Sequence, residues 1–544
     1  MDEQKQKEVF LRTLVPGTGF KFNYQPSRLD RNALYAINRV FDPEKVSRVR
    51  TKYHRAKLNV NDLRNDLMEF GAIKRPRSHT DAYYAIFESV DKDIFGDAFV
   101  VPLTHGAVAE LPALPKHKSP GLPYKTMGFN SKREALEHPE TLPRIRKMWY
   151  AIERGEPVEL PDVACYARAQ ICTRDKNKIR ATWGYPLDVY LTEAQTFYPL
   201  LDVLKNKPQP TIAYGVEIGT GGMNYVNEMA RAFKHRNFII GDWSKFDKTV
   251  PAWLIRDAFK MIARHIDWTQ VRCKDGHLWP VRPTKSKKRF AAIVKYFIDT
   301  PVQLSTGERF VKHGGVPSGS CWTNVIDGIV NALVMRYIIY SMTGSLPLDD
   351  LYLGDDSFIV VDRPVNLEML AALAEREFSM ILNVDKTFQT SNPTNIHFLG
   401  YYNIYGVPYK PIDTVVASTL YPERPVMSKF ETVTRMVGQA YSCFEPEDAK
   451  KFFLAAGILK NEIEGLDETI IEDFIKEHPH WFKYLQTLGV STRNGLTVPK
   501  VQPYDLVWLT APTAPRRAWK FKSHDLVQLA AEAYSKQETD ENFR

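Results

Sequence analysis

The chain has 544 residues, of which 44% are hydrophobic and 25% are charged. These proportions exclude a disordered or fibrous protein and leave room for a large core with two or more subdomains. The formal net charge of +9 favours a polyanionic partner. Because this excess is small for so long a chain, the distribution of charge is more informative than its total.

Five cysteines are scattered without a Cys-x-x-Cys pair, which argues against a zinc site or a disulfide framework and favours a reducing compartment. The first residues lack the apolar core of a signal peptide. The longest apolar stretch, residues 329–340, contains Asn331 and Arg336 and is too short to span a bilayer. The sequence therefore predicts a soluble intracellular protein with no membrane partner.

The first part of the chain combines short helical patterns with a basic patch and a rigid loop. The patch, residues 48–57, is consistent either with RNA contact or with a solvated helix face. Residues 112–124 are rich in proline and glycine and include Ser119-Pro120-Gly121, whose turn chemistry predicts a rigid loop. A helical segment is expected at residues 131–155.

A cationic strip follows, with Arg174, Lys178 and Arg180. Lys178 and Arg180 alternate with apolar residues, so on an extended strand they project from one face. A row of fixed cations suits a triphosphate or a nucleic-acid backbone. The alternative is a charged edge strand that prevents aggregation.

Two carboxylates come next, at the end of an apolar strand. Asp242 follows the apolar run directly, and Asp247 lies five residues further on. A proline marks the start of a helix predicted at residues 251–266.

Residues 271–296 form a second basic region, in which aromatic side chains are interleaved with cations that include Lys287, Lys288 and Arg289. Single-stranded nucleic acid requires this combination, with charge for phosphate and rings for base stacking. A solvated loop would have a similar composition.

A glycine-rich loop with Ser318 and Gly319 leads into a helix predicted at residues 321–341. Thr323, Asp327 and Asn331 recur at intervals of four on this apolar helix and form a polar stripe on one face. An unsatisfied buried polar group costs about 1–3 kcal/mol, so the stripe needs partners. These are either internal hydrogen-bond partners or a polar ligand.

The turn Gly354-Asp355-Asp356-Ser357 connects two β-type runs, which predicts a hairpin. Glycine and aspartate suit a purely structural turn, but two adjacent carboxylates between apolar strands repel one another unless they are compensated. A divalent metal ion is the expected compensation. A second doublet, Asp349-Asp350, has no evident role in the sequence.

Beyond the hairpin, a helix is predicted at residues 366–378. Lys386 and a strand pair around Phe398-Leu399-Gly400 follow. The remainder is predicted to be largely helical, including residues 429–444 and 448–464.

The order of these features resembles the motif series of viral RNA-dependent RNA polymerases with right-hand architecture, over roughly residues 119–402. The resemblance is to partitivirus polymerases first and to picobirnavirus polymerases next, because of the stretch at residues 315–327 and the serine after the aspartate doublet. The chain length is most similar to the gammapartitivirus group.

The resemblance implies an α+β right-hand fold with fingers, palm and thumb, an antiparallel palm sheet and a closed fingers–thumb ring. The implied division is an N-terminal extension and fingers at 1–237, palm motif A at 238–252, a fingers insertion at 253–310, palm motifs B to E at 311–410, and a helical thumb with a C-terminal tail at 411–544.

The resemblance also implies roles for single residues. Asp242, Asp355 and Asp356 match the carboxylates that bind two Mg²⁺ ions, for which Mn²⁺ can substitute, and Lys386 matches a lysine that protonates pyrophosphate. Nucleotide binding is expected of Arg174, Lys178, Arg180, Asp247, Ser318, Gly319, Thr323 and Asp327, and RNA binding of Ser119, Pro120, Gly121, Phe398, Leu399 and Gly400, with Lys287, Lys288 and Arg289 added from their composition.

One position departs from the picornavirus-like pattern, where an asparagine stands in place of Asp327. Asp247 matches the residue that senses the ribose 2′-hydroxyl. An ionised aspartate accepts hydrogen bonds but cannot donate them. If Asp327 approaches Asp247, repulsion is expected to raise the pKa of one of them, or a cation must pair with it.

The implied partners are an RNA template and product, ribonucleoside triphosphates and the viral capsid protein, with a segmented double-stranded RNA genome transcribed inside the virion in the host cytoplasm. Two alternatives remain at this stage. A non-catalytic RNA-binding, capsid-associated protein would gain nothing from buried acids. A reverse transcriptase would favour a bulky ring where Asp247 offers an acceptor.

Overall fold

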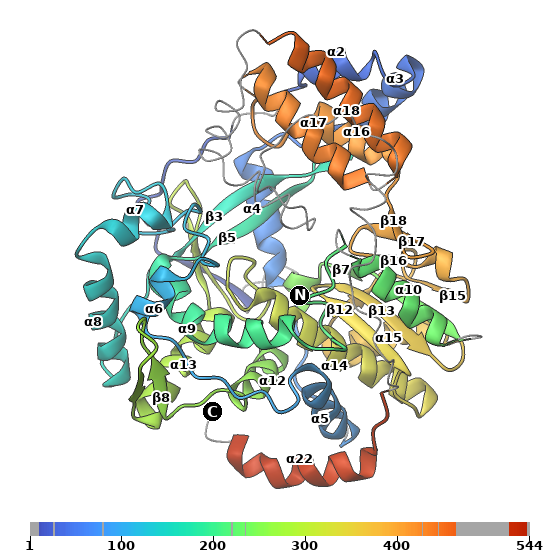
Figure 1. Ribbon diagram of the computed structural model, residues 1–544. Helices are drawn as coiled ribbons and strands as arrows, with labels where there is room; N and C mark the ends of the chain where they lie inside the picture. Colours follow the sequence, from blue (N-terminus) through green and yellow to red (C-terminus); the bar gives the residue numbers. More distant parts are fainter. Residues whose placement is uncertain are drawn as a thin grey trace, which may run out of the picture.

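A four-stranded antiparallel sheet lies at the centre of the part of the chain that carries the aspartates (Figure 1). The structure is a computed structural model and describes residues 10–463, apart from positions 25–27, 79–80, 219–220, 234–235, 427 and 444, together with residues 522–540. The strand order is β12 (Asp349–Leu353), β13 (Asp356–Val361), β6 (Asn237–Gly241) and β15 (Phe388–Thr390).

Alternating side chains of this sheet pack on opposite faces, as a pleated strand requires. Phe238 and Ile240 of β6 join a core with α10 (Gly222–Ala232), whereas Ile239 joins the main core on the other face. Gly241 pairs with Ser357 of β13, and a Cβ atom on Gly241 would lie 2.4 Å from the Ser357 hydroxyl. The sequence therefore needs glycine here to keep β6 and β13 close at the edge where the aspartates follow.

The main-core face is covered by α14 (Thr323–Thr343), which packs against α5 (Ala82–Ile94), α12 (Ala252–Ala263) and α15 (Leu367–Phe378). Among the described residues, α14 alone is long and apolar enough to cross a membrane, and 83% of its apolar window is buried inside the protein. The helix extends beyond the apolar stretch at residues 329–340 that the sequence shows. Its apolar side chains are explained by their burial in the protein core.

A second sheet carries the cationic strand. Its order is β1 (Leu11–Leu14), β11 (Arg309–Lys312), β10 (Pro301–Gln303), β3 (Val163–Ala169) and β5 (Ile179–Gly184). The helices beside it are α6 (His105–Glu110), α7 (Lys132–Glu137), α8 (Thr141–Glu153), α9 (Leu187–Lys205) and α13 (Pro283–Ile298). The segment predicted to be helical at 131–155 is thus two helices, because Pro139 disfavours helical geometry at the residue before it.

Helices from both ends of the chain form a separate bundle, at the top of Figure 1. The N-terminal α2 (Arg31–Ile37) and α3 (Pro43–Lys52) share a hydrophobic core with α16 (Ile412–Leu420), α17 (Lys429–Cys443) and α18 (Pro446–Asn461). Asp30, at the start of α2, accepts hydrogen bonds from Arg435 and Thr432 of α17, both at 2.8 Å. The N-terminal segment is therefore fastened to helices that lie some 400 positions later in the sequence.

The last helix, α22 (Leu526–Asp540), packs against α5 at the opposite end of the molecule (Figure 1). Just before it, Lys522 contacts Asp349 at 2.9 Å and Asp350 at 2.8 Å, at the start of β12. Within the range predicted as thumb, 411–544, only α16, α17 and α18 among the described helices join the bundle.

Candidate active site

Asp242 and Asp355 lie at the same edge of the central sheet. Asp242 directly follows β6, and Asp355 lies in the turn between β12 and β13, where Gly354 has a φ of +58°. Burial and the neighbouring charge of Asp355 raise the pKa of Asp242, while Lys386 and His397 act in the opposite sense. The predicted hairpin of β12 and β13 is confirmed. Because β13 also pairs with β6, the turn with Asp355 lies next to the end of β6, where Asp242 follows.

Asp356 is the more enclosed member of the doublet. Burial, followed by the charges of Asp355 and Asp242, raises the pKa of Asp356 to about 7. The backbone N–H of Leu399 donates a hydrogen bond to its carboxylate and partly offsets that rise. Leu399 lies in the turn between β16 (His397–Phe398) and β17 (Tyr401–Ile404), where its φ is +53°. Through the hydrogen bond from Leu399, the Phe398-Leu399-Gly400 hairpin contacts the turn that carries Asp355 and Asp356.

These carboxylates repel one another, and a divalent cation would relieve the repulsion. Hard ions such as Mg²⁺ prefer carboxylate oxygens, so the donor set fits. In the described part of the chain no three His, Cys, Asp or Glu side chains form a ready-made metal site. The fit therefore rests on Asp242, Asp355 and Asp356 with other oxygens, such as those of substrate phosphates.

Asn331, the third residue of the polar stripe on α14, fixes both aspartate segments. Its amide nitrogen donates to the carbonyl oxygens of Gly354 (3.1 Å) and Asp356 (3.3 Å). Its amide oxygen accepts from the Trp243 indole at 2.9 Å. Asn331 is fully buried, so internal hydrogen bonding explains its place in the stripe, and its role could not be assigned without knowing these partners.

Asp327, the middle residue of the stripe, approaches Asp247, which is the condition on which the expected pKa shift depended. The two carboxyls share a hydrogen bond. Burial and then the charge of Asp247 raise the pKa of Asp327 well above its usual range, so Asp327 holds the proton and donates it. Arg180 of β5 reaches Asp247 from the other side at 3.4 Å, which supplies the expected cation as well.

The glycine-rich loop is packed against β5. The Ser318 hydroxyl accepts from the Trp183 backbone N–H at 3.0 Å, and Thr323 donates to the Pro317 carbonyl at 2.7 Å. A Cβ atom on Gly319 would lie 1.6 Å from the Trp183 carbonyl oxygen, so no other residue fits there.

A small pocket of about 80 Å³ opens among these groups and is lined by Arg180, Asp247, Ser318 and Asp355. Four residues predicted from separate motifs thus line one space. Its wall is braced by Asp66 of α4 (Val60–Met68), which the sequence analysis did not single out.

Asp66 links the two predicted nucleotide-binding segments. One of its oxygens accepts from the Ala181 backbone N–H at 2.7 Å, and the other accepts from Lys248 at 2.5 Å. Ala181 follows Arg180 on β5, and Lys248 follows Asp247 on α11 (Phe246–Thr249). No sequence signal marks Asp66, because its partners lie more than 100 positions away.

Of the eight residues predicted to bind nucleotide, three line this pocket, namely Arg180, Asp247 and Ser318. Arg174 and Lys178 are among those that do not. Arg174 donates to the Arg50 carbonyl at 2.6 Å and to the Tyr421 hydroxyl at 3.0 Å, so it ties the cationic strip to the helical bundle. Lys178 is exposed and does not line the pocket. Lys386 is exposed, and its charge acts on Asp242.

The predicted RNA-binding loop packs at the start of α9. The Leu187 N–H donates to the Pro120 carbonyl at 2.8 Å, and Ser119 shares a hydrogen bond of 2.7 Å with Tyr166. Gly121 has a φ of +68°, and a Cβ atom there would lie 2.6 Å from a backbone oxygen. The loop is rigid, as its composition predicted.

The other predicted RNA-binding group lies on α13, which is a helix rather than a loop. Lys288 is exposed and Lys287 is half-buried. Arg289 instead turns inward, where it contacts Glu153 at 3.0 Å and Gln195 at 2.9 Å. Arg289 thus joins α8 and α9 to α13, and its RNA-binding role stays a prediction.

The fold is similar to that of the Sicinivirus 3Dpol RNA dependent RNA polymerase, with a TM-score of 0.65 at 14% sequence identity, covering 88% of this chain and 100% of that chain. This likeness defines the class as a mixed α/β polymerase fold. Residues 34–402 match the family model of the viral RNA-dependent RNA polymerase, and the chain belongs to this family.

Three relatives, each described as an RNA-directed RNA polymerase, are partitivirus-type, which confirms the resemblance seen in the sequence. The polymerase of Atkinsonella hypoxylon virus is 27% identical over 61% of this chain and 52% of its own length. That of Cryptosporidium parvum virus 1 is 28% identical over 60% of this chain and 63% of its own length. That of white clover cryptic virus 1 is 25% identical over 49% and 46%. The chain thus spans about half to three-fifths of the length of these relatives.

Proposed function

We propose that the chain acts as an RNA-directed RNA polymerase, which joins ribonucleotides in the order given by an RNA template. The observation that carries this proposal is the convergence of Asp242 and Asp355 at one sheet edge, beside a pocket that also holds Arg180 and Asp247. A protein that only bound RNA would have no use for carboxylates that repel its phosphates.

The family uses divalent metal ions, and we assign their binding here to Asp242 and Asp355, with Asp356 assisting. Bound there, two Mg²⁺ ions would activate the 3′-hydroxyl of the growing strand and stabilise the leaving pyrophosphate. Burial and mutual repulsion raise the pKa of both Asp242 and Asp356, and cation charge would favour the ionised form of each.

The surrounding residues position the nucleotide. Arg180 is half-exposed and its contact with Asp247 is long, so its guanidinium is free to turn towards a triphosphate. Asp247 accepts a hydrogen bond from the ribose 2′-hydroxyl, while Ser318 and Gly319 shape the loop that closes over the sugar. Lys386, whose charge already acts on Asp242, donates a proton to the departing pyrophosphate.

The finer assignments follow the relatives. We propose that the template and product belong to a segmented double-stranded RNA genome, that the capsid protein is a partner, and that synthesis takes place inside the virion in the host cytoplasm. The shared core of α2, α3 and α16 to α18 supports a closed ring between fingers and thumb.

The test is substitution of the two proposed metal ligands. Asp242→Ala and Asp355→Ala should each abolish Mg²⁺-dependent incorporation and leave the fold intact, because removing a repelled carboxylate costs little stability. Asp356→Asn should be milder. The matched control is Asp362→Ala at the far end of β13, where the carboxylate is exposed and paired with Arg236. Substantial synthesis by either alanine variant would refute the assignment.

A further inference from the structure

A second large hollow lies outside the catalytic pocket. It has a volume of about 720 Å³ and is bounded by α6, α8, α9, α13 and the hairpin of β8 (Gln270–Arg272) and β9 (Leu278–Pro280). These elements lie together at the lower left of Figure 1, whereas β12 and β13 lie to the right. None of its lining residues lines the pocket with Asp247 and Asp355.

The lining of this hollow is strongly cationic. Five cations face one carboxylate, Glu153, which is paired with Arg289. Lys274 is paired with Glu110 at 3.3 Å. The other three, Arg146, Arg282 and Lys285, have no ion-pair partner within the described ranges. A concave surface with charge of one sign concentrates the field and attracts phosphate.

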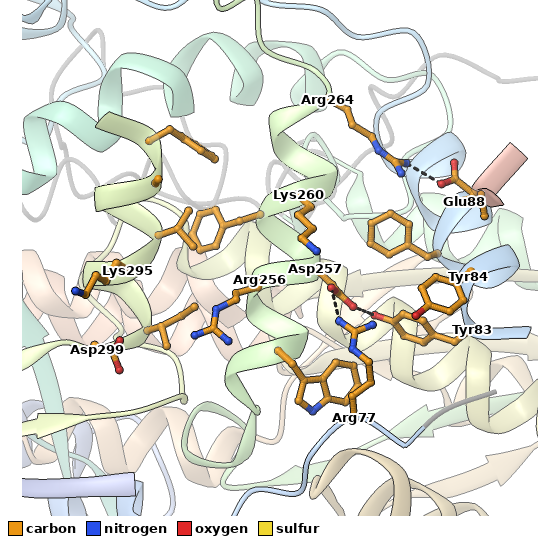
Figure 2. A pocket seen from close by; sticks show the side chains of 18 residues that line it. Arg77, Tyr83, Tyr84, Glu88, Arg256, Asp257, Lys260, Arg264, Lys295 and Asp299 are labelled. Carbon is orange, nitrogen blue, oxygen red and sulfur yellow. Dashed lines mark hydrogen bonds and ion pairs between the residues drawn. The ribbon is translucent and has the colours of Figure 1, made fainter. Parts of the chain in front are cut away.

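The neighbouring hollow on the other side of α13 shows that this charge is not a general property of the surface (Figure 2). Its volume is about 930 Å³ and it also has five cations, but three carboxylates share its lining. Asp257 holds Arg77 at 2.7 Å, and Glu88 holds Arg264 at 2.9 Å. Of these two hollows, the one beside α8 and α9 is the one that combines five cations with a single acid.

The floor of the cationic hollow offers a hydrogen-bond acceptor. Thr192 donates its hydroxyl proton to the Asp188 carbonyl at 3.1 Å, so it must accept from Nε2 of His105 at 2.8 Å. Burial lowers the pKa of His105 well below its usual range, so the ring is neutral. Its Nδ1 is therefore an acceptor, on a side chain that lines the hollow and is only 3% exposed.

Aromatic rings complete the wall. Tyr150 is 51% exposed and lines the hollow together with Trp268. Exposed rings next to phosphate-binding cations allow a base to stack while its phosphate is neutralised, at about 1–3 kcal/mol per stacked base.

We propose that this hollow binds a phosphorylated nucleotide unit, supplied either by an RNA strand outside the catalytic pocket or by a free nucleotide. Arg146, Arg282 and Lys285 bind the phosphate, and Tyr150 stacks on the base. His105 Nδ1 accepts from a sugar hydroxyl or a base amino group. The identity of the ligand rests on the proposed function, whereas the charge and shape of the site do not.

The test compares two triple variants of the full chain with the same loss of charge. R146Q/R282Q/K285Q removes the unpaired cations of the proposed site, and R256Q/K260Q/K295Q removes three cations of the hollow in Figure 2. Binding of a fluorescein-labelled single-stranded RNA is measured by anisotropy over a range of salt. We expect the first variant to lose about tenfold in affinity and to reduce the salt slope by about 2, and the control to change the slope by less than half as much.

A further variant separates stacking from charge. Tyr150→Ser should weaken RNA binding several-fold without changing the salt slope, because a stacked ring releases no counterions. Thermal unfolding of all variants checks that the exposed substitutions leave the fold intact.

The source of the nucleotide is distinguished by equilibrium dialysis with ATP. Loss of RNA affinity in the first variant, with ATP binding unchanged, assigns the site to a strand. Loss of one ATP equivalent with unchanged RNA affinity assigns it to free nucleotide. Equal effects in the two triple variants, or no effect in either, would overturn the proposal. Absence of synthesis by the wild-type protein, with the binding difference retained, would count against the polymerase function alone.

Discussion

Asp247 and Asp327 share a hydrogen bond beside the turn that carries Asp355, with the proton on Asp327, and Arg180 contacts Asp247. Picornavirus-like polymerases have an asparagine where this chain has Asp327, and an ionised aspartate could not donate a hydrogen bond as that amide does. A protonated aspartate can donate one. In the proposed function, the remaining lone pairs of Asp247 accept from the ribose.

We expect Asp327→Asn to keep most activity and most preference for ribose over deoxyribose, since an asparagine amide also donates to Asp247. Asp247→Ala should lose that preference, because the acceptor is removed. The measurement is the ratio of kcat/KM for an rNTP and its 2′-deoxy analogue. Loss of selectivity in Asp327→Asn together with retention in Asp247→Ala would show that the sugar site is assigned wrongly.

Glu193 lies beneath the glycine-rich loop, where it accepts from the Ser320 hydroxyl at 2.5 Å and from the Cys321 N–H at 3.3 Å. Burial raises the pKa of Glu193 to about 8, despite these donors. Between its ordinary value of 4.5 and about 8 the folded chain keeps a proton that the unfolded chain has lost. Stability should therefore fall as pH rises through this window.

Replacement of Glu193 by glutamine tests this linkage, because glutamine cannot ionise. The fall amounts to at most about 1.4 kcal/mol per pH unit for one group. We expect the Tm of Glu193→Gln, relative to wild type, to increase from pH 5 to pH 8. Parallel Tm curves for the two proteins would mean that Glu193 is ionised in the fold.

At the scale of elements, the segment before α22 braces the back of β12. Lys522 and Arg336 both contact Asp350, at 2.8 and 2.7 Å. Although burial alone would raise the pKa of Asp350, Arg336 and Lys522 hold it well below its usual range. The doublet Asp349-Asp350, which had no evident role in the sequence, anchors the C-terminal segment a few residues before the catalytic turn.

Lys522→Met should destabilise this anchor by up to about 3–5 kcal/mol, because Asp349 loses its lysine and Asp350 loses one of its two cations inside the protein. The control is Lys536→Met on α22, which should cost about 0–1 kcal/mol, because this lysine is 40% exposed and Glu88 keeps its pair with Arg264. Hydrogen exchange of α22 is the measurement, and protection should be lost only in Lys522→Met. Equal protection in the two variants would contradict the anchoring role.

Elements with a strong local pattern could be predicted from the sequence. The hairpin at β12 and β13 and the helices α14, α15, α17 and α18 lie close to their predicted ranges, because turn residues and apolar periodicity act locally.

Partners distant in the sequence could not be predicted in the same way. Lys522 lies 172 positions from Asp350. Composition also cannot show that Arg289 turns inward while Arg282, just before the same helix, remains exposed. The same distinction between local patterns and distant partners holds for the candidate site. Asp242, Asp247 and the doublet follow local motifs, whereas Asp66 was found only from its contacts.

At the scale of the whole molecule, both ends of the described chain are fastened to distant parts. The N-terminal α2 and α3 share a core with α16 to α18, and α22 lies against α5 at the opposite end. The central sheet with its aspartates lies between these two attachments (Figure 1). Such a frame suits a site that must hold two carboxylate segments in register while, in the proposed function, RNA moves past.

The most direct measurement is a primer-free assay with one single-stranded RNA of defined sequence, the four rNTPs and Mg²⁺, with Asp355→Ala as the blank. We expect wild-type protein to make a product of template length and complementary sequence, and Asp355→Ala to make none. The proposed polymerase would be contradicted if the protein bound the RNA without any incorporation, in Mg²⁺ or Mn²⁺ and with or without a primer. Efficient incorporation of dNTPs in place of rNTPs would identify a reverse transcriptase instead.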